Sequence, residues 1–315
     1  EMDFNGIEVF DAAKNEELVG KGAPFHIYNT HATARELREK GLQIPVLNTS
    51  VDIADGQDHA KELTAFINIA SEVFATGVCV TAVAGNEEAA RASLSAIMPY
   101  AEEKQVSVLI ETTGIYADTA RLRELMDAYA SDYLGALWSV RHPYWEFEEK
   151  PAITIRNLGA YVKHVHLVDS EADRSPALVG EGVLPLDEVM LALSSIDYDG
   201  FISLEWMPEW MEDVTEPEII LPHFVNYMDR FASTKGAKGR SLQWNHDSTG
   251  QFVWPKYDLV DLTFPQVLDR IVEEFPNQYA FKYTTLDYTR TYEEFRDDVD
   301  NFARALVSMG VKPGS

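Results

Sequence analysis

Five polar side chains stand where short apolar runs end, which is where reactive groups collect in parallel barrels. They are Glu111 in VLIETTG, Ser139 and His142 in WSVRHPYW, His166 in HVHLVDS, and Glu205 in ISLEW. Two glutamates and a histidine from separate strands can converge on one divalent cation. Such a cation polarises a carbonyl, and a flanking carboxylate can then remove the proton of the adjacent C–H bond. The pattern predicts metal-assisted isomerisation or epimerisation.

Each of these residues also has a structural interpretation. A glutamate at a strand end is usually a solvated loop residue or an ion-pair partner, so only the joint pattern favours a site. His164 and His166 share one strand, and we expect one to face the barrel interior and the other the surrounding helices. A lone histidine there is more often a satisfied core group.

The elements that would position these residues alternate along the chain. Seven runs rich in Val, Ile and Leu predict buried strands: GIEVFD (6–11), QIPVLNTS (43–50), VCVTAVAG (78–85), VSVLIETT (106–113), LGALWSV (134–140), VKHVHLVD (162–169) and FISLEW (201–206). Apolar stripes between them predict helices: Leu63, Phe66, Ile67, Ala70 and Phe74; Ala90, Leu94, Ile97, Met98 and Ala101; and Leu122, Leu125, Met126 and Tyr129. This alternation predicts parallel strands with helical crossovers, and seven strands favour a barrel over an open sheet.

The predicted fold class is α/β: a (β/α)8 TIM barrel that lacks its first strand in this chain, plus a small α+β C-terminal fragment. A closed barrel of this kind needs eight strands, whereas the sequence shows seven and opens directly into the second. We therefore expect the chain to be cut from a longer one. The predicted barrel covers residues 1–232 and ends in a helix around 218–232.

The remaining chain predicts a linker and a second unit. Residues 233–256 are polar and contain Gly and Ser, as linkers do. Residues 257–315 hold an apolar helical stripe, a strand pattern at YAFKYTT, and a helix starting at a capping box of Thr291 and Glu294. Such a short segment has a poor independent core.

The composition excludes several classes of function. Lys and Arg number 26 against 52 Asp and Glu, so the net charge is −26 and the surface repels nucleic acid and anionic lipid. The single cysteine, Cys79, rules out an intrachain disulfide and a thiolate zinc site. No long apolar stretch or leader pattern is visible, which predicts a soluble, cytoplasmic protein without membrane partners.

Three motifs resemble the sugar phosphate isomerase/epimerase family, the xylose-isomerase-like TIM barrels, over about residues 1–232. They are HVHLVDS, GEGVLPLDEV and YDGFISLEW. The resemblance implies that Glu111, His166 and Glu205 bind Mn²⁺, Mg²⁺ or a similar ion. It also implies that Glu111 and Glu205 form the acid/base pair and that His142 binds the substrate. Glu8 would be a further substrate-binding group of the pocket.

One stretch departs from that family. The family pattern resembles W-D-V-H-H-P-Y with the aspartate as a metal ligand, whereas here Ser139 stands at that fourth ligand place. Strand alternation turns Arg141 inward, so we expect its guanidinium beside Glu111 or Glu205, where it would partly replace a lost cation and could hold an anionic or polyhydroxy ligand. The alternative is that Arg141 turns to solvent and Ser139 holds the metal through a water.

The tail carries a second resemblance, to the first segment of the acyl-adenylate-forming (AMP-dependent synthetase and ligase) family. The matching residues are Thr291, Tyr292 and Glu294 at a helix start, and Gly310, Val311 and Gly314 at a turn. The resemblance covers about residues 257–315. It implies that a ligase domain is fused to the barrel, but the family's phosphate-binding loop lies beyond this chain, which therefore has no ATP site.

Three functions follow from these patterns. The first is an isomerase or epimerase acting on a sugar, sugar phosphate or polyol. The second is a barrel that has lost its metal and binds a ligand for a fused ligase, which the serine at position 139 favours. In the third, the ligase is the main activity of the protein, and the barrel supplies a substrate or a scaffold. A DNA-repair activity of AP-endonuclease type is disfavoured by 8 histidines and the charge of −26. The GEG turn at 180–182 could contact an anion through backbone N–H groups.

Overall fold

The computed structural model describes residues 4–206, 217–235, 263–283 and 288–312. The chain divides into two compact units, Glu1–Phe231 and Ala232–Ser315. Most of the predicted linker lies outside the described residues. No helix in the described ranges is both long and apolar enough to cross a membrane.

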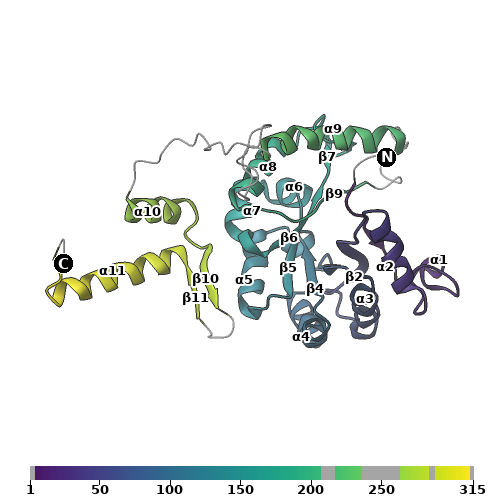
Figure 1. Ribbon diagram of the computed structural model, residues 1–315, viewed down its shortest axis with the longest axis horizontal. Helices are drawn as coiled ribbons and strands as arrows, with labels where there is room; N and C mark the ends of the chain where they lie inside the picture. The colour runs from purple at the N-terminus through teal and green to yellow at the C-terminus, as the bar shows by residue number, and fades with distance from the viewer. Residues whose placement is uncertain (1–3, 207–216, 236–262, 284–287, 313–315) are drawn as a thin grey trace. The chain divides into compact units, whose positions relative to one another are not determined.

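The first unit is built on one parallel sheet of seven strands, and all seven predicted runs contribute to it. The strands are β1 Val9–Phe10, β2 Val46–Asp52, β3 Gly77–Thr81, β4 Ser107–Glu111, β5 Leu134–Ser139, β6 Val162–Leu167 and β9 Ile202–Leu204, paired in that order. Consecutive strands are neighbours and parallel, as the predicted crossovers require (Figure 1). The fold is therefore α/β and TIM-barrel-like.

The sheet curls until its two ends approach each other. The carboxylate of Glu8, just before β1, lies within hydrogen-bond distance of His164 and His166 on β6, across the barrel interior. At the rim, a Cβ at Gly6 would stand 2.9 Å from Cε1 of Phe201, so glycine permits the close approach there. Among the described strands β1 and β9 are not paired, which leaves a barrel of seven strands with an open seam.

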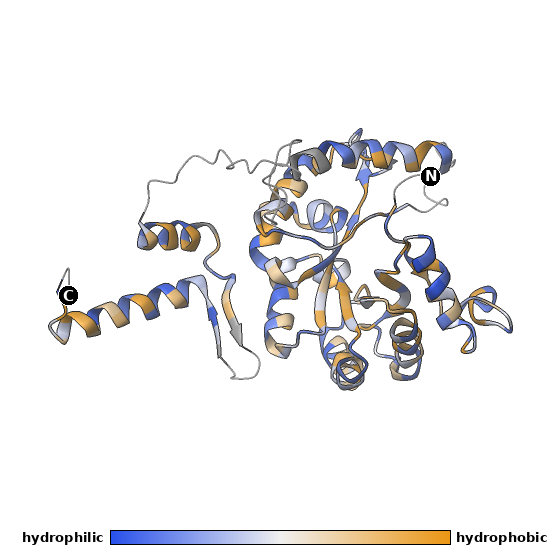
Figure 2. Ribbon diagram, in the orientation of Figure 1, coloured by the Kyte–Doolittle hydropathy of each residue, from blue (hydrophilic) through white to orange (hydrophobic). Residues whose placement is uncertain are grey.

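Helices follow the strands and bury the predicted stripes. The main ones are α2 Thr30–Glu39, α3 Ala60–Val73, α4 Glu87–Lys104, α5 Thr119–Tyr129, α7 Pro151–Leu158, α8 Leu186–Ser195 and α9 Pro217–Lys235. One predicted stripe residue is wrong: Phe74 adopts a left-handed conformation as the C-cap of α3 and is 64% exposed, because the helix has already ended. The polar helix α2 stands out in blue in Figure 2.

The second unit holds helix α10 Phe264–Glu274, an antiparallel hairpin of β10 Tyr279–Tyr283 and β11 Tyr288–Thr291, and helix α11 Tyr292–Ser308. The predicted capping box is confirmed: Thr291 Oγ1 accepts from the N–H of Glu294, whose carboxylate accepts from the N–H of Thr291. Phe281 packs edge-to-face on Phe295. Helix α11 has no buried residue, as expected for a unit with a small core.

Candidate metal and active site

The ends of four strands place the predicted site residues side by side. Glu111 is the last residue of β4 and Ser139 the last of β5; Ser139 pairs in register with His166 of β6. Glu205 follows β9 directly, and its N–H donates to the carbonyl of Leu167. Because parallel strands present their carboxyl ends at one rim, residues far apart in the sequence meet there.

Glu111, His166 and Glu205 form a group that can hold a metal ion. Each offers one ligand atom, and these atoms lie within 4.8 Å of one another. His166 Nδ1 is buried and has no hydrogen-bond partner among the described residues. A histidine with one nitrogen left without a partner, grouped with two carboxylates, is a donor set that suits Mn²⁺, Mg²⁺ or a similar ion, so these residues fit the predicted cation.

The charges of this group also favour a cation. Burial raises the pKa of the Glu111 carboxyl, and the neighbouring Glu205 raises it further. Burial alone would lower the pKa of His166, but Glu8, Glu205 and Glu111 outweigh it and raise the pKa to about 9. The metal-free site therefore retains protons, and a bound cation would neutralise the same carboxylates.

A second group lies deeper in the barrel and shares His166. Glu8, His164 and His166 also offer ligand atoms within 4.8 Å of one another. Here, however, the side chains already bond to each other: both Nε2 atoms reach the Glu8 carboxylate, at 2.6 Å from His164 and 2.9 Å from His166. Burial would raise the pKa of Glu8, yet the two histidines hold it well below its usual range.

The prediction that His164 and His166 face opposite sides of the sheet is wrong. Residues two apart on a strand point to the same face, because side chains alternate with a period of two. Both rings accordingly point into the barrel, 5.4 Å apart and nearly perpendicular. Reading that period correctly would have placed His164 on the same face as His166 from the sequence.

Ser139 occupies the predicted fourth ligand place. It is fully buried, and its Oγ donates to Glu205 Oε2 over 3.3 Å. Its backbone is fixed by Thr112, whose Oγ1 accepts from the Ser139 N–H and donates to the Ser139 carbonyl. The hydroxyl is therefore directed at a candidate metal ligand.

Arg141 does not take the predicted place beside a site glutamate. Its Nη2 donates to the carbonyl of Arg174 over 3.2 Å, and none of the described ion pairs joins it to Glu111 or Glu205. Val140 already has helical angles, so helix α6 (Arg141–Phe147) begins directly after β5 and the alternation that predicted an inward arginine no longer applies.

His142, the second predicted substrate-binding residue on α6, is partly exposed. Its Nδ1 lies 3.0 Å from Glu146 Oε1, one turn further along the same helix. The ring therefore stands at the rim of the barrel, oriented by a carboxylate.

The GEG turn is not free to bind an anion as predicted. The buried carboxylate of Asp169, in the short strand β7 (Asp169–Ser170), accepts from the N–H groups of Gly180 and Gly182 at 2.9 and 3.0 Å, and from that of Leu184 at 3.1 Å. These donors are already satisfied by a carboxylate of the chain. A Cβ at Gly182 would stand 2.3 Å from Asp169 Oδ1, so this close approach requires glycine.

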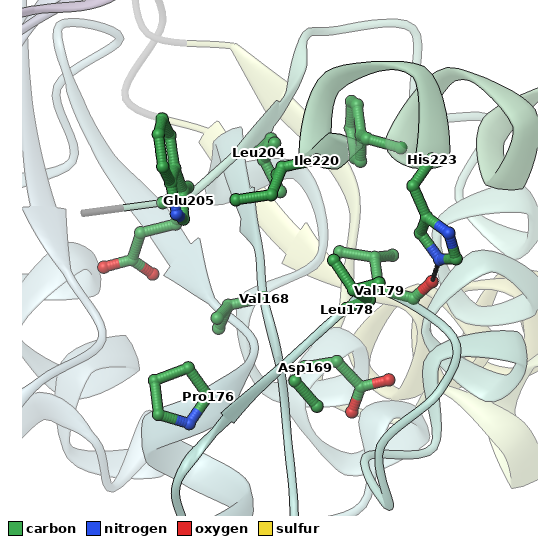
Figure 3. Close-up of a pocket in the computed structure, with 12 residues that line it drawn as sticks. Val168, Asp169, Pro176, Leu178, Val179, Leu204, Glu205, Ile220 and His223 are labelled. Carbon is green, nitrogen blue, oxygen red and sulfur yellow. Dashed lines mark hydrogen bonds between the residues drawn. The ribbon is translucent and has the colours of Figure 1, made fainter. Parts of the chain in front are cut away.

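A small pocket lies behind Glu205, between the ends of β6 and β9 and helix α9. Leu204, Ile220 and Val179 are among its apolar lining residues, and His223 bonds to the Val179 carbonyl (Figure 3). Its volume is about 20 Å³, which holds roughly one water molecule. Figure 3 shows the Glu205 carboxylate turned away from Ile220 and His223; one of its oxygens lies within 4.8 Å of the ligand atoms of Glu111 and His166.

Comparisons with known proteins agree with this architecture. Solved structures that are similar include a 3-keto-D-glucoside 4-epimerase from E. coli (17% identity, 74% of this chain and 90% of the other, TM-score 0.57). Others are a D-allulose 3-epimerase from Methylomonas sp. (16%, 73% and 87%, 0.57) and an L-ribulose 3-epimerase (16%, 75% and 87%, 0.60). At these identities the likeness shows the fold. The search of curated proteins found no match.

The family comparison assigns the barrel but not the tail. Residues 1–221 match the family described as xylose isomerase-like TIM barrel, which is about the extent of the predicted resemblance. No comparison supports the ligase resemblance of residues 257–315, which stays a prediction. With most of its length matched, and with the strand order that such a barrel requires, the chain belongs to the xylose isomerase-like TIM barrel family.

Proposed function

We propose that the chain is a metal-dependent isomerase or epimerase acting on a sugar, sugar phosphate or related polyol. The observation that carries the proposal is the convergence of Glu111, His166 and Glu205, whose ligand atoms lie within 4.8 Å. These three residues would hold Mn²⁺ or Mg²⁺, with Ser139 at the fourth place. When bound, the cation supplies polarisation of a substrate carbonyl.

The proton transfers fall to the two glutamates. One removes the proton from the carbon beside the carbonyl, and the other delivers a proton to the product. Burial and the neighbouring Glu205 raise the pKa of the Glu111 carboxyl, so it accepts a proton more readily than an exposed glutamate does. In this proposal His142 and Arg141, both on α6, would bind substrate hydroxyl or anionic groups. Three of the similar structures bear the names of sugar epimerases, which supports this substrate class, although another is named a probable 3-DHS dehydratase.

Ser139 favours one alternative function. A neutral hydroxyl is a weak ligand for a hard cation, and here it already donates to Glu205. A barrel with impaired metal binding would hold a polyol or anion without turning it over. It would then serve the ligase predicted from the resemblance of residues 257–315.

The test is solvent exchange at the substrate carbon. The 315-residue chain, supplied with Mn²⁺, is incubated in D₂O with a panel of ketoses and their phosphates, and deuterium incorporation is followed by NMR. We expect incorporation beside the carbonyl of at least one substrate, reduced about 100-fold or more in Glu111→Gln and Glu205→Gln.

The matched control is Glu149→Gln, at a partly buried glutamate that accepts from Thr119 and Thr154 away from the site. It should exchange as the unmodified chain does. Saturable sugar binding without exchange, unaffected by Mn²⁺, would instead establish the ligand-binding barrel.

A further inference from the structure

The carboxylate of Glu8 is saturated by donors of its own barrel. Asn48 Nδ2 and His166 Nε2 reach Oε2 at 2.5 and 2.9 Å, and His164 Nε2 reaches Oε1 at 2.6 Å. The Glu8 side chain is only 13% exposed. A carboxylate only accepts, so each histidine Nε2 must donate its proton. Little of this carboxylate is left to bind a cation or a substrate.

This arrangement assigns the two nitrogens of His166 different tasks. Because Nε2 donates to Glu8, the ring keeps its proton there when it becomes neutral to bind a metal, and the lone pair that it offers is then on Nδ1. Nδ1 is the buried atom without a partner. An unpaired buried polar atom is costly, and His166 is grouped with Glu111 and Glu205, so an ion held by these three residues would give Nδ1 the partner that it lacks.

Two further residues fix Glu8 itself. Asn48, on β2, donates from its Nδ2 to Oε2 of Glu8. His164 bonds to Oε1 of Glu8. The His164 side chain is 2% exposed, and its Nε2 also lies 3.1 Å from Ser203 Oγ. Its ring meets that of His166 edge-to-face, so a rotation of either ring would break a contact of the other.

We infer that Glu8 is a positioning residue, which holds His166 by Nε2 so that Nδ1 is presented to the metal, and is not itself a metal ligand or a substrate-binding group. The inference rests on the metal site of the proposed function. A carboxylate bonded to the second nitrogen of a ligating histidine fixes the ring and increases the basicity of the ligating nitrogen. The group of Glu8, His164 and His166 then supports the metal-binding group of Glu111, His166 and Glu205.

The first test measures Mn²⁺ binding to the full chain by titration calorimetry. We expect one ion per chain, bound about 10–100-fold more weakly by Glu8→Gln with unchanged stoichiometry. Glu8→Ala removes the acceptor entirely and should weaken binding at least as much, with thermal unfolding as the check that it folds. Glu149→Gln, which changes a partly buried glutamate elsewhere, should bind as tightly as the unmodified chain.

The second test reads the tautomer of His166 directly. Histidine-selective ¹⁵N labelling gives long-range proton–nitrogen spectra of the metal-free and Zn²⁺-loaded chain, with His166→Gln as the assignment control. We expect a protonated Nε2 in both and a metal-shifted Nδ1 in the loaded form. In Glu8→Gln the Nε2 proton should exchange faster with water.

Each contrary result has one meaning. Equal Mn²⁺ affinity in Glu8→Gln, or zinc bound to Nε2, would overturn the positioning role. Two bound ions, one of them lost in Glu8→Gln, would make Glu8 a ligand and overturn it as well. If the unmodified chain binds no Mn²⁺, the proposed metal site fails and the positioning role fails with it. If the spectra of that metal-free chain still show a proton on His166 Nε2, the hydrogen bond to Glu8 is real but has no role in metal binding.

Discussion

At the scale of single residues, the unusual feature of this barrel is a serine among carboxylates. Ser139 is fully buried and donates to Glu205, and as a neutral residue it adds no charge to a site that already holds Glu111 and Glu8. The exchange of a carboxylate for a hydroxyl makes the metal-free site more stable and the metal-bound site weaker. A substitution at position 139 should therefore change the relative stability of the metal-free and the metal-bound protein.

We predict that Ser139→Asp has opposite effects on the metal-free and the Mn²⁺-loaded chain. Without metal, a further buried carboxylate beside Glu205 should lower the Tm by several degrees. With Mn²⁺ it should bind the ion tightly enough to raise the Tm above that of the unmodified chain. Thermal unfolding with and without Mn²⁺ measures both, and Ser139→Asn, of the same size but neutral, is the control. An Asp variant that gains no more from Mn²⁺ than the Asn variant would contradict the fourth-ligand assignment.

Metal binding should be linked to pH through His166. Its pKa of about 9 means that the ring is protonated at pH 7, whereas a ligating ring must be neutral. Binding should therefore release about one proton at pH 7, and the affinity should rise about tenfold per pH unit up to about pH 9 and level off above. Titration calorimetry in buffers of different ionisation enthalpy counts the protons. Heats that do not depend on the buffer would show that His166 is already neutral.

At the scale of elements, the site depends on what happens just after each strand. The seven strands could be recognised from their apolar runs, and the capping box at Thr291 from its two residue types, because these signals are local. Arg141 was misplaced because α6 begins one residue earlier than strand alternation assumes. The GEG turn was misread because its true partner, Asp169, lies more than ten residues earlier in the chain.

Asp169 should matter for stability more than for chemistry. Asp169→Ala leaves the N–H groups of Gly180, Gly182 and Leu184 without an acceptor, at about 1 kcal/mol or more each. We expect the free energy of unfolding to fall by about 3 kcal/mol, with Asp169→Asn intermediate because it keeps one acceptor oxygen. Urea denaturation gives the values. Asp173→Ala, at an exposed turn, should leave stability nearly unchanged, and an equal loss there would show that the effect is not specific to the buried carboxylate.

At the scale of the whole molecule, the chemistry belongs to one of two units. All candidate ligands lie within residues 1–231, and the family match ends at residue 221. The second unit has its own hairpin and helices and contributes none of the described site residues. The net charge of −26 adds a general attraction for cations and opposes binding to polyanions.

Mn²⁺ should therefore protect the two units unequally. Binding to the native barrel lowers the population of its open states, so hydrogen exchange should slow in β4, β6 and β9. We expect α10 and α11 to exchange at the same rates with and without the ion. Mass spectrometry of peptides from the intact chain measures this. Protection confined to the second unit would place the metal outside the proposed site.

The sequence by itself determined the parallel α/β barrel, its seven strands and the convergence of Glu111, His166 and Glu205, because strand periodicity and strand ends are local patterns with a known consequence in space. Only the tertiary structure decided that Glu8 reaches across the barrel to His164 and His166, and that Arg141 turns away from the glutamates. Those contacts depend on the curvature of the sheet and on where a helix begins. Both are set by packing over the whole barrel, which no short stretch of sequence encodes.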